Sequence, residues 1–241
     1  MFLIKIVAQL FLVFVVFTLF QDGYKTYRYV QHSKVLIAQS IPYQQSVSGA
    51  TSTILIIGDS TAVGTGSSRP EDSTAGLIGS LYPQSNIINE GMVGERLHEL
   101  VSKFDPSSIK GTISLIVIQI GANDVTHFTS LKSISKDLTT LIEKSKLVSA
   151  KVVVLHGGDV GIAPVIPWYI KRIFRHNTLE IRKIFLSVTH SENVHYVDIM
   201  FDGADDMFRS NPSTYFAADG FHPSSAGYKV WFGKIKEAIS R

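Results

Sequence analysis

Short apolar runs alternate with longer amphipathic stretches along the chain after Thr53. Runs rich in Ile, Val or Leu predict five strands, at Ile54–Ile57, Asn86–Asn89, Ser114–Ile120, Lys151–Leu155 and His195–Ile199. Apolar residues at helical spacing predict helices at Leu131–Val148, Trp168–Thr189 and Ser225–Ser240. Strands that alternate with helices are typical of a parallel sheet. We therefore expect an α/β fold, a doubly wound three-layer α/β/α sandwich around a central parallel five-stranded sheet.

A different pattern marks the N-terminus. Ile6 to Phe20 contains no charged residue, and three more apolar residues precede Lys5. This length lies between the roughly 10–14 residues of a signal-peptide core and the roughly 20 that span a bilayer. The residues that close the run are too bulky for the small-residue pattern that signal peptidase recognises. We expect an uncleaved, single-pass transmembrane anchor helix over residues 1–21 rather than a removed signal.

The chain after the anchor divides into two further parts. Residues 22–52 are polar, carry scattered tyrosines and end in a Ser/Gly/Thr-rich stretch, which indicates a juxtamembrane stalk. Residues 53–241 form the predicted folded domain. Basic residues flank the apolar run on both sides, so their count does not fix the orientation. We favour a membrane-anchored domain on the extracytoplasmic side and leave the oligomeric state open.

Composition excludes several classes of chemistry. The chain has no cysteine, which rules out disulfides, a thiolate nucleophile and cysteine-bound metal. The net charge is only +3 and the basic residues are scattered, so we expect no nucleic-acid partner. Asp202, Asp205 and Asp206 lack the glycine-containing spacing of a calcium loop, and we interpret them as a solvated loop. No metal and no cofactor is expected.

The first candidate for chemistry is Ser60, in the sequence Gly58-Asp59-Ser60 directly after the first predicted strand. Open α/β sheets place reactive groups at such strand ends. A serine hydroxyl is a poor nucleophile at neutral pH and needs a neighbouring base and donors for the oxyanion that it creates. The tripeptide alone is more typical of a turn with a capping Asp or Ser.

A candidate base lies just before the last predicted helix, in Asp219-Gly220-Phe221-His222. An Asp three residues before a His on a turn can accept from one imidazole nitrogen and leave the other for a serine proton. A capped helix start is the simpler alternative for this segment. His127 is the main competing histidine, but no carboxylate is placed as suitably beside it.

Candidate oxyanion donors follow the second and third predicted strands. Gly91 and Gly94 lie in Asn89–Gly94, and Asn123 follows Gly121. A glycine N–H can approach a reacting carbonyl closely, and an Asn amide is a directed donor. Each segment by itself is also typical of a turn.

Taken together, GDSTAVGTG, NEGMVG, GAND and DGFHP resemble the four blocks of the GDSL or SGNH hydrolases, over about residues 53–240. The resemblance implies a flavodoxin-like SGNH-hydrolase fold, with Ser60 as nucleophile and first oxyanion donor. Gly94 and Asn123 would be the other donors, and Asp219 would orient His222 as the base. The family spacing favours Gly94 over Gly91. Thr61 stands where the family name has Leu.

The implied activity is that of a serine esterase or lipase-like hydrolase that forms an acyl-enzyme on Ser60. A lysophospholipid, a short-chain aryl ester and an acetylated glycan are all candidate substrates, and the anchor inclines us toward lipid. The alternative function is a flavodoxin-like phosphate- or nucleotide-binding module that uses the Ser60–Gly66 loop at a helix N-terminus. It gives no role to Asp219 and His222.

One insertion is more apolar than a surface connection should be. Gly161–Phe174 contains Pro164, Pro167 and Trp168, followed by Lys171 and Arg172. It either anchors the next helix in the core, lines an acyl pocket, or touches the bilayer with its basic residues at lipid phosphates. The sequence leaves these three uses open.

Overall fold

The structure, a computed structural model, describes residues 2–109, 111–201, 203 and 206–240. Its strands are β1 (Ser52–Gly58), β2 (Ser85–Asn89), β3 (Leu115–Ile120), β4 (Val152–His156) and β5 (His195–Tyr196). Its longer helices are α1 (Phe2–Gln39), α3 (Thr74–Leu81), α4 (Leu97–Lys103), α6 (Leu131–Lys146), α7 (Lys171–Ser191) and α10 (Ser225–Ile239). Short helices are α2 (Ser60–Val63), α5 (Ala122–Thr126), α8 (Met207–Ser210), α9 (Pro212–Tyr215), and the 3-10 turns η1 (Pro70–Asp72), η2 (Pro106–Ser108) and η3 (Val160–Ile162).

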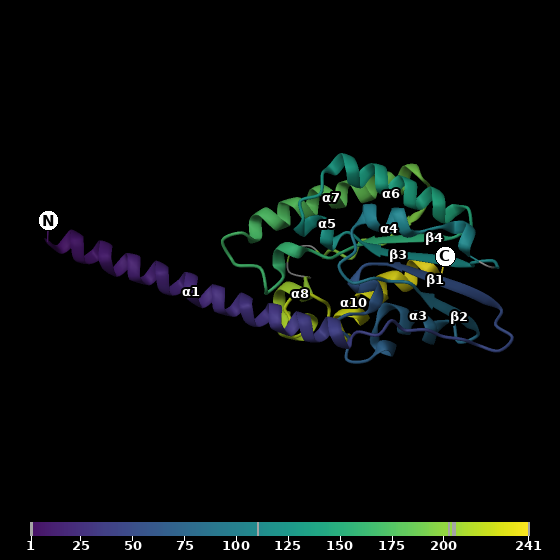
Figure 1. Ribbon diagram of the computed structural model, residues 1–241, viewed down its shortest axis with the longest axis horizontal. Coiled ribbons are helices and arrows are strands. Elements are labelled where there is room, and N and C mark those ends of the chain that lie inside the picture. The colour runs from purple at the N-terminus through teal and green to yellow at the C-terminus, as the bar shows by residue number, and fades with distance from the viewer. Residues whose placement is uncertain (1, 110, 202, 204–205, 241) are drawn as a thin grey trace.

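The strands form one parallel sheet in the order β2-β1-β3-β4-β5. Helices α4, α5, α6 and α7 cover one face, and α3 and α10 cover the other (Figure 1). Each face has its own apolar core, because side chains of successive strand residues point to opposite sides. The predicted five-stranded, three-layer α/β/α sandwich is confirmed. The reversal of strand order at β1 creates a crevice at the carboxyl ends of β1 and β3.

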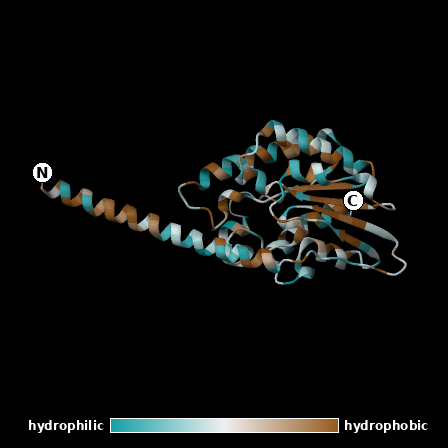
Figure 2. Ribbon diagram, in the orientation of Figure 1, coloured by the Kyte–Doolittle hydropathy of each residue, from teal (hydrophilic) through white to brown (hydrophobic). Residues whose placement is uncertain are grey.

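Helix α1 runs without a break from Phe2 to Gln39 and projects far from the domain (Figure 1). Its outer half is mainly apolar, with a few hydrophilic positions near the N-terminus, and is not buried (Figure 2). It is long and apolar enough to span a membrane, and its place near the N-terminus also suits a signal sequence. Within the described residues, helix continues to Gln39 through the segment predicted as a stalk, so the stalk begins as a rigid extension of the apolar run. The division into anchor, stalk and domain at residues 21 and 52 stays a prediction.

The segment after α1 lies against the domain. Gln45 forms an antiparallel bridge with Ile87 of the edge strand β2, and the Gln44 side chain bonds the backbone of Asn89. These contacts cover the outer edge of β2, which would otherwise expose unpaired backbone groups. Residues 44 and 45 therefore belong to the folded domain in space, although they precede β1 in the chain.

Candidate active site

The Ser60 loop is built at the end of β1. Gly58 adopts φ +141, and a β-carbon there would lie 1.8 Å from the carbonyl oxygen of Gln119 on β3, so only glycine allows the chain to turn here. Asp59 caps α2 by accepting from the backbone N–H of Thr61 at 2.8 Å and from its hydroxyl at 2.7 Å. Ser60 is the first residue of α2 and is only 5% exposed.

Asp59 has an unusual electrostatic environment. Its carboxyl is fully buried, and this burial raises its pKa to about 6, while the two bonds from Thr61 act in the opposite direction. The Tyr228 hydroxyl donates to the Thr65 carbonyl at 2.8 Å and ties the far end of the same loop to α10. Burial also raises the pKa of Tyr228. The loop that carries Ser60 is thus held at both ends by buried hydrogen bonds.

The second side of the site is the turn before α10. Asp219 Oδ1 accepts from the backbone N–H groups of Phe221 and His222, both at 3.0 Å. Ser224 caps α10 by accepting from the Gly227 N–H, so the capped helix start considered from the sequence is present as well. The cap fixes where α10 begins, and the Asp219 bonds fix the direction of the turn just before it.

Three of the predicted site residues lie in one hydrogen-bonded chain. His222 Nε2 lies 2.8 Å from Ser60 Oγ, and His222 Nδ1 lies 2.5 Å from Asp219 Oδ2. All three side chains are buried, with His222 only 4% exposed. Burial alone would raise the pKa of Asp219, but its bonds to His222 and to the two N–H groups together lower that pKa. Asp219 is therefore ionised at neutral pH and can hold the imidazole N–H.

Asn123 links two other blocks of the motif. It lies on α5, which starts at Gly121 with φ +118, and its Nδ2 donates to the Glu95 carbonyl at 3.0 Å. The neighbouring Asp124 accepts from the Leu97 N–H at 3.0 Å, at the start of α4. The end of β3 thereby holds the turn at residues 94–96. This positioning contact of Asp124 was missed from the sequence, where Asn-Asp was interpreted only as a turn.

The two candidate glycine donors differ in the structure. The Gly91 N–H already donates to the Asn89 side chain at 3.0 Å, and a β-carbon on Gly91 would lie 2.7 Å from the Val63 nitrogen. Gly94 adopts φ +78 in an exposed turn, and within the described part of the chain its N–H bonds no acceptor. Gly91 is thus occupied in packing against α2, which leaves Gly94 as the glycine available to a ligand.

Other sequence candidates lie elsewhere. His127 Nδ1 bonds the Asn123 carbonyl on its own helix at 2.8 Å and is exposed. Asp202 and Asp205 lie outside the described residues, and Asp206 caps α8. Among the residues that the structure describes, no group of three or more His, Asp or Glu side chains is placed to hold a metal ion.

A small apolar cavity of about 50 Å³ adjoins His222. Its wall includes Phe216, Phe221 and Trp231, and the first part of the apolar insertion, Ile162 and Ala163, closes one side. Ile166 and Phe174 of the same insertion pack against the core, whereas Trp168 at its tip is 71% exposed. The insertion therefore contributes to the pocket at its start, to the core through Ile166 and Phe174, and to the surface at Trp168.

The sequence model of the GDSL-like lipase/acylhydrolase family matches residues 56–230. The chain belongs to this family. The four blocks that carried the resemblance all lie in the matched region.

The chain is similar to one curated protein in sequence and to two solved structures in fold. The GDSL-like esterase Rv1075c of Mycobacterium tuberculosis is 25% identical over 183 residues, which cover 73% of this chain and 58% of that protein. A lipolytic G-D-S-L family protein from Veillonella parvula superposes with a TM-score of 0.64 at 16% identity, over 79% of this chain and 100% of that one. A variant of Axe2, an acetyl xylan esterase from Geobacillus stearothermophilus, superposes with a TM-score of 0.60 at 19% identity, over 79% and 95%. The two solved structures share the fold.

The contact of α1 with the site was not foreseen from the sequence. A β-carbon on Gly220 would lie 2.9 Å from the Tyr29 ring, and Ser40 Oγ donates to Thr65 Oγ1 at 3.0 Å. Helix α1 thus touches the turn before His222, and Ser40, directly after α1, touches the loop after Ser60.

Proposed function

We propose that this protein hydrolyses carboxylic esters through an acyl-enzyme on Ser60, with His222 as general base and Asp219 as the group that orients it. The observation that carries the proposal is the continuous contact from Ser60 Oγ to His222 Nε2 at 2.8 Å and from His222 Nδ1 to Asp219 at 2.5 Å. This arrangement meets the geometric requirement for activating a serine hydroxyl.

In the first half-reaction, Ser60 Oγ attacks the ester carbonyl carbon while His222 Nε2 takes the hydroxyl proton. The carbonyl oxygen becomes an oxyanion, and we assign its stabilisation to the Ser60 N–H, the Gly94 N–H and the Asn123 amide. One amide hydrogen of Asn123 is held by the Glu95 carbonyl, so the second remains for the oxyanion. Collapse breaks the ester C–O bond, and His222 returns the proton to the leaving alcohol.

In the second half-reaction, water attacks the acyl group on Ser60. His222 Nε2 takes a proton from this water, and Ser60 Oγ receives the proton when the acid leaves. Throughout, ionised Asp219 accepts from His222 Nδ1 and stabilises the imidazolium. No residue outside the chain is required for these proton transfers.

We assign the acyl group to the apolar cavity beside His222, because Thr61 and Ala122, the neighbours of Ser60 and Asn123, also line it, and its size favours a short acyl group. A volume of about 50 Å³ holds only a few water-sized groups. Short-chain aryl esters and acetylated glycans therefore suit the site better than a long-chain lysophospholipid. The shared fold with Axe2, an acetyl xylan esterase, agrees with this substrate class. A series of p-nitrophenyl esters tests it, with kcat/KM expected to fall steeply beyond a few carbons.

A fluorophosphonate probe tests the mechanism directly, because it reacts with an activated serine. We expect the full-length protein in detergent to be labelled, and Ser60→Ala and His222→Ala to abolish labelling. Ser67→Ala is the matched control and should be labelled normally, because the Ser67 hydroxyl lies on the same loop and donates to the Gly64 carbonyl. Labelling that persists in folded Ser60→Ala would disprove the assignment.

The phosphate-binding alternative finds less support. The backbone N–H groups from Thr61 to Thr65 already donate within the loop, to Asp59 and Ser60. A phosphate cradle requires such groups to point at the ligand. Helix α2 is also only one turn long, with residues Ser60–Val63.

A further inference from the structure

A second hollow lies between α1 and the domain, away from Ser60. It has a volume of about 350 Å³ and is lined by basic residues of three elements. Lys25 comes from α1, Lys171, Arg172 and Arg175 come from the start of α7, and Arg209 comes from α8. We call this hollow the basic hollow. Lys171 and Arg172 belong to the apolar insertion Gly161–Phe174, and the ester-hydrolysis mechanism gives them no role.

Only part of this positive charge is neutralised by the protein. Asp159 pairs with Arg175 and, at 3.7 Å, with Arg209, which also lies 3.5 Å from Asp206. In the described part of the chain, no carboxylate pairs with the three other cations, Lys25, Lys171 and Arg172. The basic hollow therefore has an excess of positive charge.

The pKa of Lys171 responds to the nearby positive charges. Its ammonium donates to the Ile162 carbonyl at 3.3 Å. Partial burial, followed by the nearby Lys25 and Arg209, lowers its pKa below the ordinary value. An anion in the basic hollow would relieve this repulsion, because an opposite charge favours the ionised ammonium.

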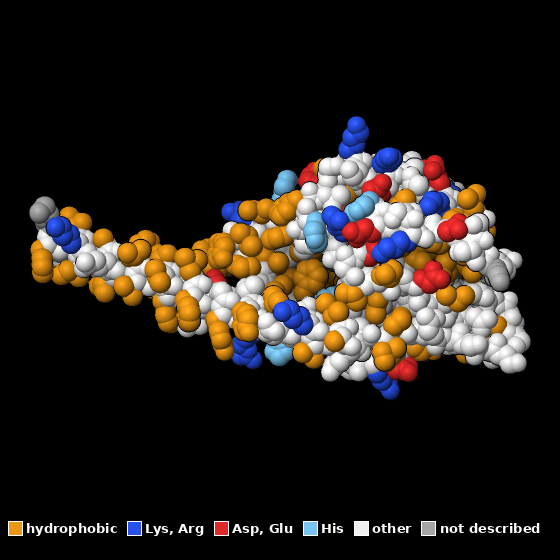
Figure 3. Space-filling model, in the orientation of Figure 1, with side chains coloured by type: hydrophobic (Ala, Val, Ile, Leu, Met, Phe, Trp, Pro, Cys, Tyr) orange, Lys and Arg blue, Asp and Glu red, His pale blue; other side chains and the backbone are white. Residues whose placement is uncertain are grey.

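Exposed aromatic and aliphatic side chains lie next to these cations. Trp168, Tyr169 and Ile173 are all exposed, and the two aromatic rings pack edge to face at 5.8 Å. The loop before α7, which carries Trp168 and Tyr169, projects from the domain on the side from which α1 extends (Figure 1). Orange side chains gather along α1 and along the part of the domain that it meets (Figure 3). Tryptophan and tyrosine beside cations are typical of the interface between lipid and water.

The length of α1 determines how far this surface lies from the hydrocarbon core of a membrane that α1 spans. The uncharged part of α1 ends at Gln21, and Tyr29, which touches the domain at Gly220, lies eight residues further on. Eight residues of helix rise about 12 Å. The polar headgroup layer on each side of the hydrocarbon core is roughly 5–8 Å thick. If the apolar part of α1 spans the bilayer, Lys25 lies at headgroup depth and the domain begins just beyond it.

We infer that the basic hollow binds the phosphate of an anionic phospholipid in the leaflet next to the domain, with Trp168 and Tyr169 inserted between the headgroups. The inference rests on the anchoring role of α1 and is independent of catalysis by Ser60. Such a bound lipid would bridge α1 to α7 and hold the site at a fixed orientation above the membrane. Phosphate is the ligand because clustered lysine and arginine side chains recognise it by charge and hydrogen bonding.

The test uses the full-length chain in nanodiscs that contain phosphatidylcholine and phosphatidylglycerol, with Ser60→Ala so that no ester is consumed. After gentle extraction, native mass spectrometry counts the retained lipids. We expect the Ser60→Ala protein to retain phosphatidylglycerol preferentially. Adding Lys25→Gln, Lys171→Gln and Arg172→Gln should reduce that preference by about five-fold per cation.

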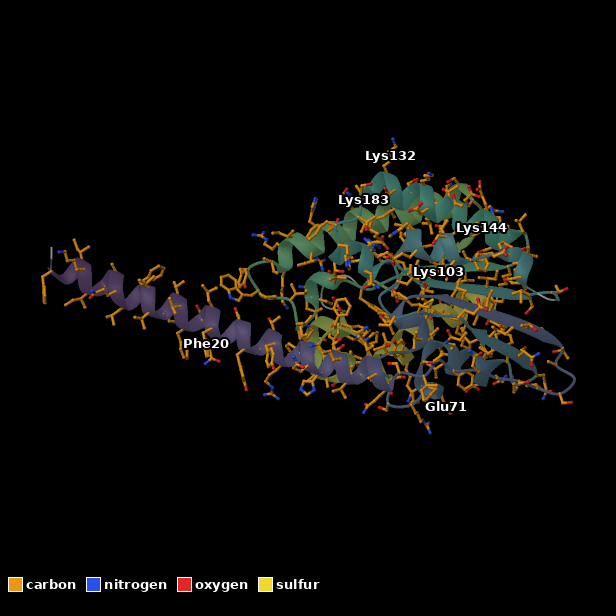
Figure 4. All side chains as sticks on the ribbon, in the orientation of Figure 1. Phe20, Glu71, Lys103, Lys132, Lys144 and Lys183 are labelled. Carbon is orange, nitrogen blue, oxygen red and sulfur yellow. The ribbon has the colours of Figure 1, made fainter. Side chains whose placement is uncertain are left out.

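The matched control also removes three exposed charges, far from the basic hollow. Lys132 and Lys136 lie on α6 and Lys183 lies on α7, and Figure 4 shows Lys132 and Lys183 along the upper side of the domain, away from α1. Lys132→Gln, Lys136→Gln and Lys183→Gln together should keep the preference. Equal retention in the two charge variants would overturn the inference. So would inorganic phosphate that displaces the lipid completely at millimolar concentration, because the hollow would then be a site for free anions.

Brominated phosphatidylcholine gives a second readout that needs no bound anion. It quenches tryptophans that enter the bilayer. Trp168 is exposed at the loop tip, whereas Trp231 lies in the core, so quenching should disappear in Trp168→Phe. A protein whose fluorescence is not quenched would show that the tip stays out of the membrane and would contradict the inference.

Discussion

At the scale of single residues, the ionised Asp219 has two tasks that one substitution separates. Its Oδ1 holds the backbone of the turn, and its Oδ2 accepts from His222 Nδ1. In Asp219→Asn the amide oxygen can keep the backbone contacts, but the amide nitrogen cannot accept an imidazole proton. We expect kcat on p-nitrophenyl acetate to fall by about 10⁴-fold, because His222 then adopts the wrong tautomer.

The control for this variant is Glu71→Gln, an exposed carboxylate on η1. It removes the same charge and should leave kcat within about two-fold of the parent. Glu71→Gln should unfold at the same urea concentration as the parent, whereas Asp219→Asn loses the buried bond to His222 and should unfold at a lower one. A large loss of activity in both variants, or full activity in Asp219→Asn, would count against the assigned role of Asp219.

Because the pKa of Asp59 is raised, we expect the stability of the protein to depend on pH. Its pKa is raised from 3.8 to about 6 by burial, so the native state prefers the neutral carboxyl. The stabilisation from this group is fully present below pH 3.8 and is lost as the pH rises through about 6. The shift of about two units corresponds to roughly 3 kcal/mol. Asp59→Asn, which keeps an acceptor for Thr61, should therefore gain stability over the parent as the pH rises.

Urea unfolding of both proteins at a series of pH values measures this difference. The free energy of unfolding of Asp59→Asn minus that of the parent should increase up to about pH 6 and stay level above it. Other titrating groups occur in both proteins and cancel in the difference. A difference that does not change with pH would show that the Asp59 carboxyl titrates normally.

At the scale of elements, two Gly→Ala substitutions compare the cost of a backbone conformation that only glycine adopts with the gain in helix propensity. Gly58→Ala would place a β-carbon 1.8 Å from the Gln119 carbonyl oxygen, at a φ of +141. We expect a loss of about 3 kcal/mol or more, or failure to fold. Gly233→Ala is the matched change on α10, where a β-carbon meets nothing within 4 Å. It should stabilise the protein by about 0.5–1 kcal/mol. Thermal unfolding of both variants measures the contrast.

Long periodic elements could be predicted from the sequence, and short ones could not. The positions of β1 to β4, α6 and α10 agree with the predicted ranges to within a few residues, because their apolar patterns extend over several side chains. The fifth strand is shorter than predicted: it pairs only with β4 and ends at Tyr196. One-turn helices such as α2 and α9 contain too few residues to show a period.

The sequence could predict those site residues that directly follow a strand. Ser60 follows β1 and Asn123 follows β3, and parallel strands bring their carboxyl ends together. The contact of Tyr29 with Gly220 was not predictable, because it joins a segment before the domain to a turn near its end. The same holds for the bond from Asn123 to Glu95, since a polar pair has no periodic pattern.

At the scale of the whole molecule, the rigid connection between α1 and the catalytic loops has a functional consequence. Ser40 bonds Thr65, and Tyr29 contacts Gly220, so the distance from the apolar part of α1 to Ser60 is fixed. If α1 spans the bilayer, Ser60 lies at a fixed distance from the membrane surface, and an ester carried by a membrane component must extend that far to reach it. A soluble ester reaches Ser60 from solution at any distance. A longer α1 should therefore slow the hydrolysis of membrane-bound esters only.

A helical insertion between Phe20 and Gln21 tests this consequence. Seven residues of the sequence Glu-Ala-Ala-Lys-Ala-Ala-Ala raise the domain by about 10 Å and rotate it by only about 20°. We expect the rate on a short ester attached to a phospholipid headgroup to fall on the order of ten-fold in proteoliposomes. The rate on soluble p-nitrophenyl acetate should not change, because the insertion lies outside all contacts between α1 and the domain. A parallel fall in both rates would mean that the insertion disturbs the site itself, and unchanged rates on both would mean that the height of the domain does not limit access to membrane-bound esters.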